Sequence, residues 1–366
     1  MVLKFFRLVL LCFSFCFAIK ANLYKEVFYT ETDSFSECIL GVDFGGTNAD
    51  FGFFVVEHEK PVLVCSIHLK TKEISDFTQT FHAIVQHAEK NYGIVVQHAC
   101  IGSPGARSAG KDFSTGGKTK LPVDAKKIKA ATGLQNVIVL NDFEVIGYGV
   151  DLLPSGSVIQ LNKGIPQEGA PKVIVGAGTG LGTSYLIWDH YKKRYFSVWS
   201  ELGAVPFCAL SQQEFDFAQE SFTKTGRLPD WNYVLGGVGG IEVLQEFLCD
   251  LSDEQLKPQE IFGQYGMDFD CTKTVDLYLK LYARFAQIAT FSILPYGGLY
   301  IAGGIAAKNK HLFEQGTFLS SFFDTSRVGR KWDLLHDIPV YLIIDYRVSL
   351  YGAAQYLLYE LQATQN

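Results

Sequence analysis

The chain has 366 residues, of which 48% are hydrophobic and 19% are charged, and its formal net charge is −6 at pH 7. This length and apolar content favour two domains with separate cores, and the acidic balance without a long basic run argues against nucleic-acid binding. The eight cysteines are scattered without Cys-x-x-Cys or Cys/His spacing, so we expect no zinc site and mostly buried, reduced thiols.

The N-terminal residues 1–21 resemble a secretory signal. Lys4 and Arg7 precede an apolar stretch at residues 8–18, which is too short for a stable membrane span. The alternative is an extended start before a domain that begins near Phe35.

Apolar runs predict alternating strands and helices along the rest of the chain. From residue 38 the chain is predicted to form a strand, a loop and two further strands, and a helix follows at Phe77–Tyr92. The same strand–loop–strand–strand order returns after residue 172. This repetition implies two like-folded α/β halves with a cleft between them. We expect a small domain at 36–140 plus 348–366 and a large domain at 141–347. The predicted strands are 38–42, 49–56, 61–68, 94–101, 137–140, 173–175, 183–188, 195–198, 299–302 and 339–344, and the further helices are 212–223, 241–248, 274–293 and 349–361.

Glycine-rich loops end two of the predicted strands. The first reads Asp43-Phe44-Gly45-Gly46-Thr47-Asn48, and the second reads Gly176-Ala177-Gly178-Thr179-Gly180-Leu181-Gly182. Paired Gly and Thr residues put several N–H groups and hydroxyls on one concave surface, which suits phosphate oxygens. Two such loops that face each other from two domains would clamp the phosphates of a nucleotide.

Other phosphate-binding motifs fit these segments poorly. The dinucleotide fingerprint Gly-x-Gly-x-x-Gly fails because the sixth position from Gly176 is Leu181 and a strand follows where a helix is required. Near-matches to a Walker A loop occur at 105–111 and at Gly117-Lys118-Thr119, but the first lacks the final hydroxyl residue and the second lacks the leading glycine. We interpret both as chance.

Asn141 and Asp142 directly follow the predicted strand 137–140. Both residue types favour helix N-termini, so simple capping explains one of them. At a strand exit between two phosphate loops, Asp142 is also a candidate general base for a substrate hydroxyl, and Asn141 is a candidate donor to a neighbouring hydroxyl. Glu201, taken alone, reads as a solvated loop carboxylate.

Together, these blocks resemble the bacterial-type glucokinase family, within the clan of sugar kinases, actin and heat-shock ATPases. The resemblance runs from residue 39 to about 355 and includes the blocks at 139–144, 234–237, 301–305 and 338–341. It implies an α/β fold of the ribonuclease H-like/actin-like ATPase type, in which two domains enclose a cleft. It also implies transfer of the γ-phosphoryl group of ATP, with Mg²⁺, to the 6-hydroxyl of glucose or a related hexose.

The resemblance assigns a role to each matching residue. Asp142 would be the catalytic base, and Asn141, Glu201 and Thr119 would bind the sugar. Asp43 would hold Mg²⁺ through water. The residues expected to bind ATP are Val42, Asp43, Phe44, Gly45, Gly46, Thr47, Asn48, Gly178, Thr179, Gly180, Gly303 and Gly304.

The departures from the family pattern fall almost entirely on the sugar side. Ala204 stands where the family has a histidine, and Thr119-Lys120 replaces a Thr-Asn pair. The family's carboxylate before the 234–237 block falls on Asn232 or, alternatively, on the nearby Asp230, and Asp50 replaces an arginine after the first loop. Each lost hydrogen bond to a buried sugar hydroxyl costs about 0.5–1.5 kcal/mol, so two or three losses would weaken glucose binding by about one to three orders of magnitude.

Two functions therefore compete. The first is an active ATP-dependent hexose kinase, with another acceptor such as an amino sugar or polyol as a variant of it. The second is a catalytically weak or inactive regulator of the same fold that binds sugar or nucleotide. The expected partners are a hexose and ATP, with no nucleic acid and no stable membrane span, and the sequence leaves a homodimer open. The need for ATP favours the cytoplasm, and export is the alternative if the N-terminal segment acts as a signal peptide.

Overall fold

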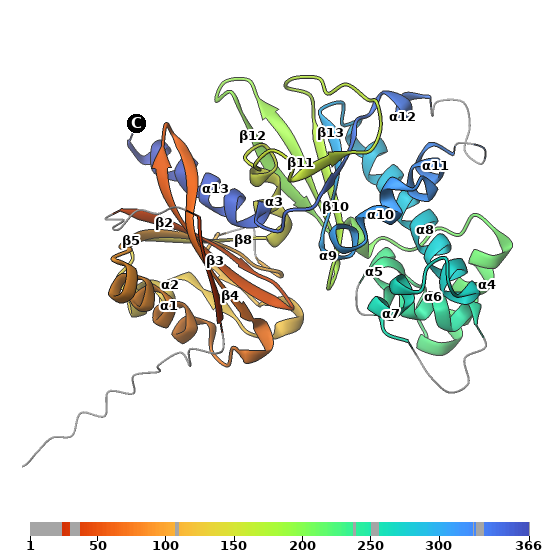
Figure 1. Cartoon of the computed structure of the whole chain (residues 1–366), viewed down its shortest axis with the longest axis horizontal. Helices are drawn as coiled ribbons and strands as arrows, with labels where there is room; N and C mark the ends of the chain where they lie inside the picture. Colours follow the sequence, from red (N-terminus) through yellow and green to blue (C-terminus); the bar gives the residue numbers. More distant parts are fainter. Residues whose placement is uncertain are drawn as a thin grey trace, which may run out of the picture.

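Two six-stranded sheets stand side by side in the computed structural model of the chain (Figure 1). The structure describes residues 24–29, 37–106, 110–236, 239–249, 256–324, 326 and 333–365. The signal-like segment 1–21 and Gly237 of the predicted 234–237 block lie outside these residues.

The first sheet has the strand order β1-β4-β3-β2-β5-β8. Its strands β2, β3 and β4 form antiparallel hairpins, whereas β5 and β8 add in parallel on the other side of β2. The bounds are β1 (Tyr24–Phe28), β2 (Cys38–Phe44), β3 (Asn48–Glu57), β4 (Lys60–Lys70), β5 (Val96–Gly102) and β8 (Asn136–Leu140).

The second sheet has the order β12-β11-β10-β13-β14-β9 and repeats this arrangement. Here β10, β11 and β12 are the antiparallel hairpins, and β13 and β14 add in parallel beside β10. The internal repeat predicted from the sequence is therefore confirmed. The bounds are β9 (Val158–Gln160), β10 (Lys172–Ala177), β11 (Leu181–Asp189), β12 (Arg194–Ser200), β13 (Gly298–Ala302) and β14 (Val340–Ile343).

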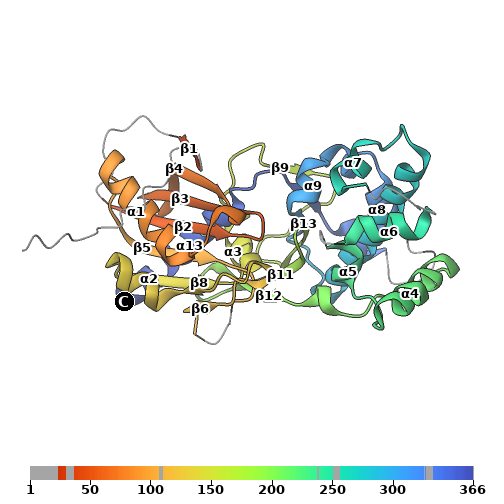
Figure 2. The same cartoon turned by 90° about the horizontal axis from the view of Figure 1, so that it is seen from below.

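Helices cover both faces of the first sheet (Figures 1 and 2). On one face lie α1 (Phe77–Tyr92) and α2 (Ala125–Thr132), and on the other lies α13 (Val348–Gln365). Helix α1 begins at the capping side chain of Asp76, and Gly93 ends it with φ 65°. Its apolar side chains fall at helical spacing and pack on the aromatic residues of β2 and β3, which forms one core.

Helix α3 (Asp142–Gly149) crosses α13 at very short range and also contacts β11 and β12 of the second sheet. Glycine makes this crossing possible. A Cβ on Gly352 of α13 would lie 1.7 Å from the carbonyl oxygen of Val145, and one on Gly149 of α3 would lie 2.0 Å from that of Val348. The two helices therefore meet backbone to backbone, between the two sheets.

A group of helices lies on the outer side of the second sheet, partly against the sheet and partly stacked farther out (Figure 1). The longest is α8, whose buried aromatic side chains Tyr278, Tyr282 and Phe285 lie in the largest core cluster. The helices are α4 (Gln212–Thr225), α5 (Trp231–Leu235), α6 (Gly240–Leu248), α7 (Pro258–Gly263), α8 (Phe269–Ile293), α9 (Gly304–Lys308), α10 (Lys310–Glu314), α11 (Thr317–Phe323) and α12 (Leu334–Asp337).

Four short elements, two strands and two turns, complete the site region. A two-stranded sheet of β6 (Phe113–Ser114) and β7 (Val123–Asp124) encloses the 3-10 turn η2 (Gly117–Thr119), and the turn η3 (Leu202–Ala204) follows β12. Among the residues that the structure describes, no helix is both long enough and apolar enough to cross a bilayer. The division into a small and a large domain stays our proposal.

Candidate active site

The first glycine loop joins β2 to β3. Hydrogen bonds hold its backbone: the Gly45 amide donates to the Asn48 carbonyl at 2.9 Å, and the Thr71 hydroxyl donates to the Gly45 carbonyl at 2.8 Å. Gly46, Thr47 and Asn48 are exposed. The carbonyls of Gly45 and Thr47 are engaged within the protein, while the exposed residues Gly46 and Thr47 carry amides and a hydroxyl, groups that suit an anion site.

Two of the predicted ATP-binding residues lie below this surface. The side chains of Val42 and Phe44 are fully buried in the core of the first sheet. Any contact that they make with a nucleotide would have to come from the backbone.

The second glycine loop joins β10 to β11 and faces the first. The Gly178 amide donates to the Gly180 carbonyl at 2.8 Å, which closes the turn. The hydroxyl oxygens of Thr47 and Thr179 lie 3.4 Å apart, and a Cβ on Gly46 would lie 2.9 Å from the Thr179 methyl carbon. The structure thus brings together two loops that are about 130 residues apart in the chain.

Asp43 lies near the end of β2, opposite Asp50 on β3. The Ser349 hydroxyl donates a hydrogen bond of 2.5 Å to Asp43 Oδ2. Burial, together with the nearby carboxylates of Asp50 and Asp142, raises the pKa of Asp43 to about 7, although the Ser349 bond lowers it. Three carboxylates therefore lie close together, and one of them, Asp50, accepts a hydrogen bond from His68 Nδ1 at 2.7 Å.

Asn141 and Asp142 lie where β8 ends and α3 begins. Asn141 is the N-cap residue, and its Oδ1 accepts from the Phe143 amide at 2.8 Å, while Asp142 Oδ1 accepts from the same amide at 3.0 Å. The capping role considered for this pair is therefore present. The pKa of Asp142 is raised to about 6. Burial is the main cause, the charge of Glu201 also raises the pKa, and hydrogen bonds from backbone amides lower it.

Glu201 is exposed at the start of η3, near enough to Asp142 to affect its pKa. Asn232, one of the departures from the family pattern, has a structural contact. Its Oδ1 accepts from the Leu181 amide at 2.8 Å, and a Cβ on Gly203 would lie 2.8 Å from its Nδ2. Asn232 thus connects the second glycine loop to the segment that carries Glu201.

Thr119 ends η2, and its hydroxyl is engaged within that turn. It donates to the Gly116 carbonyl at 2.7 Å and accepts from the Leu121 amide at 3.1 Å. The neighbouring Lys118 extends instead to the second loop, where its Nζ donates to the Thr179 carbonyl at 2.9 Å. The structure therefore places Thr119 close to the site but gives its hydroxyl partners inside the turn.

Gly303 and Gly304 follow β13, beside the second loop. Gly303 has φ 91°, and a Cβ there would lie 2.5 Å from the Ala177 carbonyl oxygen at the end of β10. Only glycine fits such a close approach with a positive φ. The Tyr346 hydroxyl donates to the Gly304 carbonyl at 3.3 Å, so an aromatic ring borders this edge.

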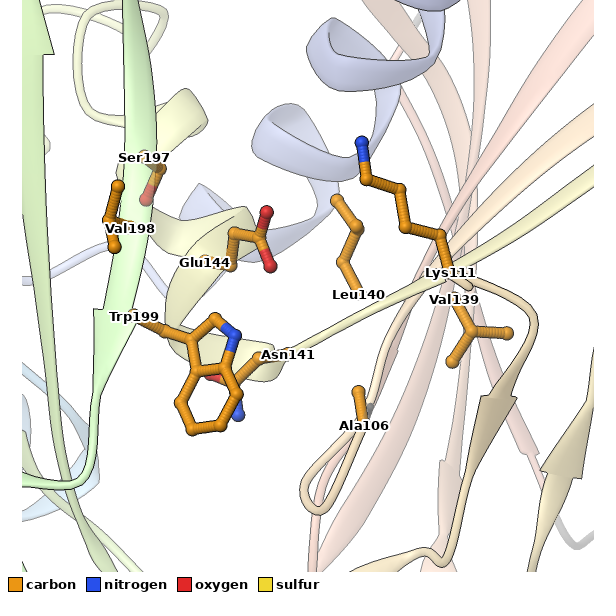
Figure 3. A pocket seen from close by; sticks show the side chains of 9 residues that line it. All are labelled: Ala106, Lys111, Val139, Leu140, Asn141, Glu144, Ser197, Val198 and Trp199. Atoms are coloured by element: carbon orange, nitrogen blue, oxygen red, sulfur yellow. The ribbon is translucent and has the colours of Figure 1, made fainter. Parts of the chain in front are cut away.

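A cavity of about 210 Å³ lies between the two sheets next to Asn141 (Figure 3). Lys111 lines one side, the Trp199 indole lines the other, and the Glu144 carboxylate projects between them. Burial raises the pKa of Glu144 to about 7, although Lys111 lowers it. The cavity adjoins the candidate site through Asn141, which lines it.

The donor groups suit Mg²⁺ only as a partly hydrated ion. Among the residues with described positions, no group of three or more His, Cys, Asp or Glu side chains could hold a metal directly. Mg²⁺ usually keeps several waters and binds through one or two carboxylates together with substrate phosphates. Burial is the main cause of the raised pKa values of Asp43 and Asp142, and nearby carboxylates raise both further; a bound cation would stabilise the ionised forms, so these residues fit the ion.

Comparison with models of protein families shows the family to which the chain belongs. The model of the glucokinase family, described as "Glucokinase", matches residues 40–360. The chain belongs to the glucokinase family. Glucokinase from Pectobacterium atrosepticum is 31% identical over 235 residues, which are 63% of this chain and 71% of that protein. Glucokinase from Yersinia pestis is 32% identical over 231 residues, or 62% and 69% of the two chains.

Solved structures show the fold of this glucokinase-family chain. A glucokinase from an Antarctic psychrotroph superposes with a TM-score of 0.71 at 21% identity, and covers 88% of this chain and 99% of its own. The glucokinase of Balamuthia mandrillaris in complex with glucose gives 0.74 at 17% identity, with coverages of 88% and 93%. The predicted family and the predicted actin-like α/β fold class are confirmed.

Several residues at the glucokinase-family site escaped the sequence analysis. Ser349 contacts Asp43 from 306 positions away, Lys118 contacts Thr179, and Tyr346 borders Gly304. In the sequence, Lys118 stands out only as part of the Walker-like segment Gly117-Lys118-Thr119, which we interpret as a chance match. No local pattern marks a contact between residues so far apart in the chain.

Proposed function

We propose that the protein transfers the γ-phosphoryl group of ATP to the 6-hydroxyl of glucose or a related hexose. The observation that carries this proposal is the meeting of the two glycine loops, with the Thr47 and Thr179 hydroxyls 3.4 Å apart and Asp43 and Asp142 at the adjacent strand ends. Phosphoryl transfer depends mainly on positioning and on stabilising charge, and this arrangement suits both.

In the proposed reaction, the loop amides and threonine hydroxyls hold the phosphates of ATP. Asp43 would hold Mg²⁺ through water, and the ion would supply positive charge to the phosphate oxygens. Gly303 and Gly304 border the adenosine. Asp142 takes the proton of the attacking hydroxyl, and its pKa of about 6 leaves it mostly ionised yet basic at neutral pH.

The sugar contacts of the proposed site are fewer than the family pattern implies. Asn141 and Glu201 bind hydroxyls in this proposal, but Ala204 supplies no imidazole, and the Asn232 amide oxygen is committed to the Leu181 amide. Glucose binding should therefore be weak, with a KM about one to three orders of magnitude above that of an enzyme with the full set.

A coupled assay tests the proposal. Purified protein with Mg²⁺-ATP and a panel of hexoses, amino sugars and polyols should release ADP with at least one hexose. Tight ATP binding with no turnover on any acceptor would reject the kinase and favour the inactive regulator. Because the reaction consumes ATP, we place it in the cytoplasm, and fractionation with N-terminal sequencing of the native protein tests the exported alternative.

A further inference from the structure

Lys118 sits on a turn whose shape is fixed by its neighbours. Gly116 has φ 74°, and a Cβ there would lie 2.0 Å from the Leu121 carbonyl oxygen, so only glycine fits. The Gly116 amide donates to the Ser114 hydroxyl at 2.9 Å, and the Thr119 hydroxyl donates back to the Gly116 carbonyl. This turn belongs to the loop between β6 and β7, beside the first sheet, and it holds the start of the Lys118 side chain in one place.

From this turn the ammonium group of Lys118 reaches the second sheet. Its Nζ donates to the Thr179 carbonyl at 2.9 Å, and Thr179 is the residue whose hydroxyl lies 3.4 Å from that of Thr47. An ammonium has three N–H donors, and this bond uses one of them. Lys118 therefore brings a positive charge to the point where the two glycine loops meet.

The rest of this region is acidic. Asp142 lies close enough to Asp43 to raise the pKa of Asp43, and Glu201 lies close enough to Asp142 to raise the pKa of Asp142. Lys70 is also near the first loop, but its Nζ donates to the Asn48 side chain at 2.8 Å, on that loop alone. The Lys118 ammonium has a backbone carbonyl as its partner in an exposed position, and an exchange of that partner for a phosphate oxygen costs little because phosphate is the stronger acceptor.

We propose that Lys118 is a further catalytic residue, whose ammonium group contacts the phosphoryl group held between the two loops and neutralises charge that develops during its transfer. The proposal rests on the kinase function proposed above. Preorganised cations at a transferring phosphoryl group act in this way in general. The alternative is a purely structural role, in which Lys118 only ties η2 to the second loop.

The test compares Lys118→Met and Lys118→Arg with a matched control, Lys127→Met. Lys127 is exposed on α2, so its replacement removes the same charge from a nearby surface away from the loops. We expect Lys118→Met to lower kcat about 100-fold or more, with the hexose Kd and the melting temperature unchanged. Lys118→Arg should restore part of the rate, and Lys127→Met should match the wild type.

Two results would overturn the proposal. One is an unchanged kcat in Lys118→Met, and the other is a loss of rate that follows a matching fall in melting temperature and is not rescued by arginine. If the wild type turns over no acceptor, the kinase function itself fails. Calorimetry with AMPPNP then still tests the contact, because Lys118→Met should weaken binding at least tenfold and unchanged binding would refute it.

Discussion

Replacement of Asp142 by Asn should slow catalysis strongly and at the same time stabilise the fold. Asn keeps the side-chain oxygen that accepts from the Phe143 amide, but it has no charge and takes up no proton at neutral pH. The pKa of Asp142 is raised by burial from 3.8 to about 6. One pKa unit is worth about 1.4 kcal/mol, so the ionised carboxylate destabilises the folded state by about 3 kcal/mol at a pH above both values.

The pH dependence of this effect has a definite sign. Above pH 7 the carboxylate of Asp142 is ionised in both states, and the folded state bears the full cost. As the pH falls from about 6 towards 4, the folded protein takes up the proton first, so the wild type recovers its stability relative to the variant. The gain from Asp142→Asn should therefore be about 3 kcal/mol at pH 8 and should shrink towards zero at pH 4.

Urea unfolding at pH 8 and at pH 4 measures the stability change, and the coupled assay at pH 8 measures turnover, which should fall about 100-fold to 10,000-fold. Asp189→Asn is the matched control, because that carboxylate is held by backbone N–H bonds that lower its pKa, and its removal should give no gain. A variant with wild-type kcat would remove Asp142 as the base. A variant less stable than the wild type at pH 8 would refute the argument from burial.

Three further predictions follow from the same structure. The kcat/KM of the wild type should rise with pH between about 5.5 and 7.5, because Asp142 and Asp43 must lose protons near pH 6 and 7, and a flat profile would count against both roles. Ala204→His should lower the glucose KM about twofold to tenfold in steady-state assays if the missing imidazole contact is restored, with the KM for ATP unchanged as its control. Gly352→Ala should lower the free energy of unfolding by more than about 2 kcal/mol, since its Cβ would lie 1.7 Å from a carbonyl oxygen of α3, whereas Gly263→Ala meets nothing within 4 Å and should unfold like the wild type.

Most of the secondary structure could be predicted because apolar residues dominate the buried strands and helices. The predicted helix at 77–92 agrees with α1 at both ends, where Asp76 and Gly93 provide the caps. Helix α2 was missed because it buries only Ala125 and Ile128 in a lysine-rich segment. Helix α3 was missed because Gly147 and Gly149, which allow close packing on β12 and on α13 respectively, are poor helix formers and made the segment resemble a loop.

The site was predictable where its chemistry is local and hidden where it depends on the fold. Each glycine loop is a short continuous segment, so its residues could be identified in the chain. Asn232 shows the limit of prediction from sequence. The sequence marked it only as a position where the family has a carboxylate, whereas in the structure its side-chain amide supports the second loop. The same holds for Ser349, which meets Asp43 only after α13 packs on the first sheet. The roles of the individual site residues stay predictions until the variants are measured.

The repeated strand order of the two sheets has a consequence for the origin of the site. Strands β2 and β10 hold equivalent positions in the strand orders of the two sheets, so the loops that follow them are topologically equivalent, as expected after duplication of an ancestral half. The equivalence extends to single residues: Asp43 stands two positions before Gly45, and Gly176 stands two positions before Gly178. Each half thus contributes a phosphate-type loop, but only the first half carries a carboxylate at this position. Loss of symmetry at this one pair of positions would give the phosphate site a metal-binding side and a metal-free side.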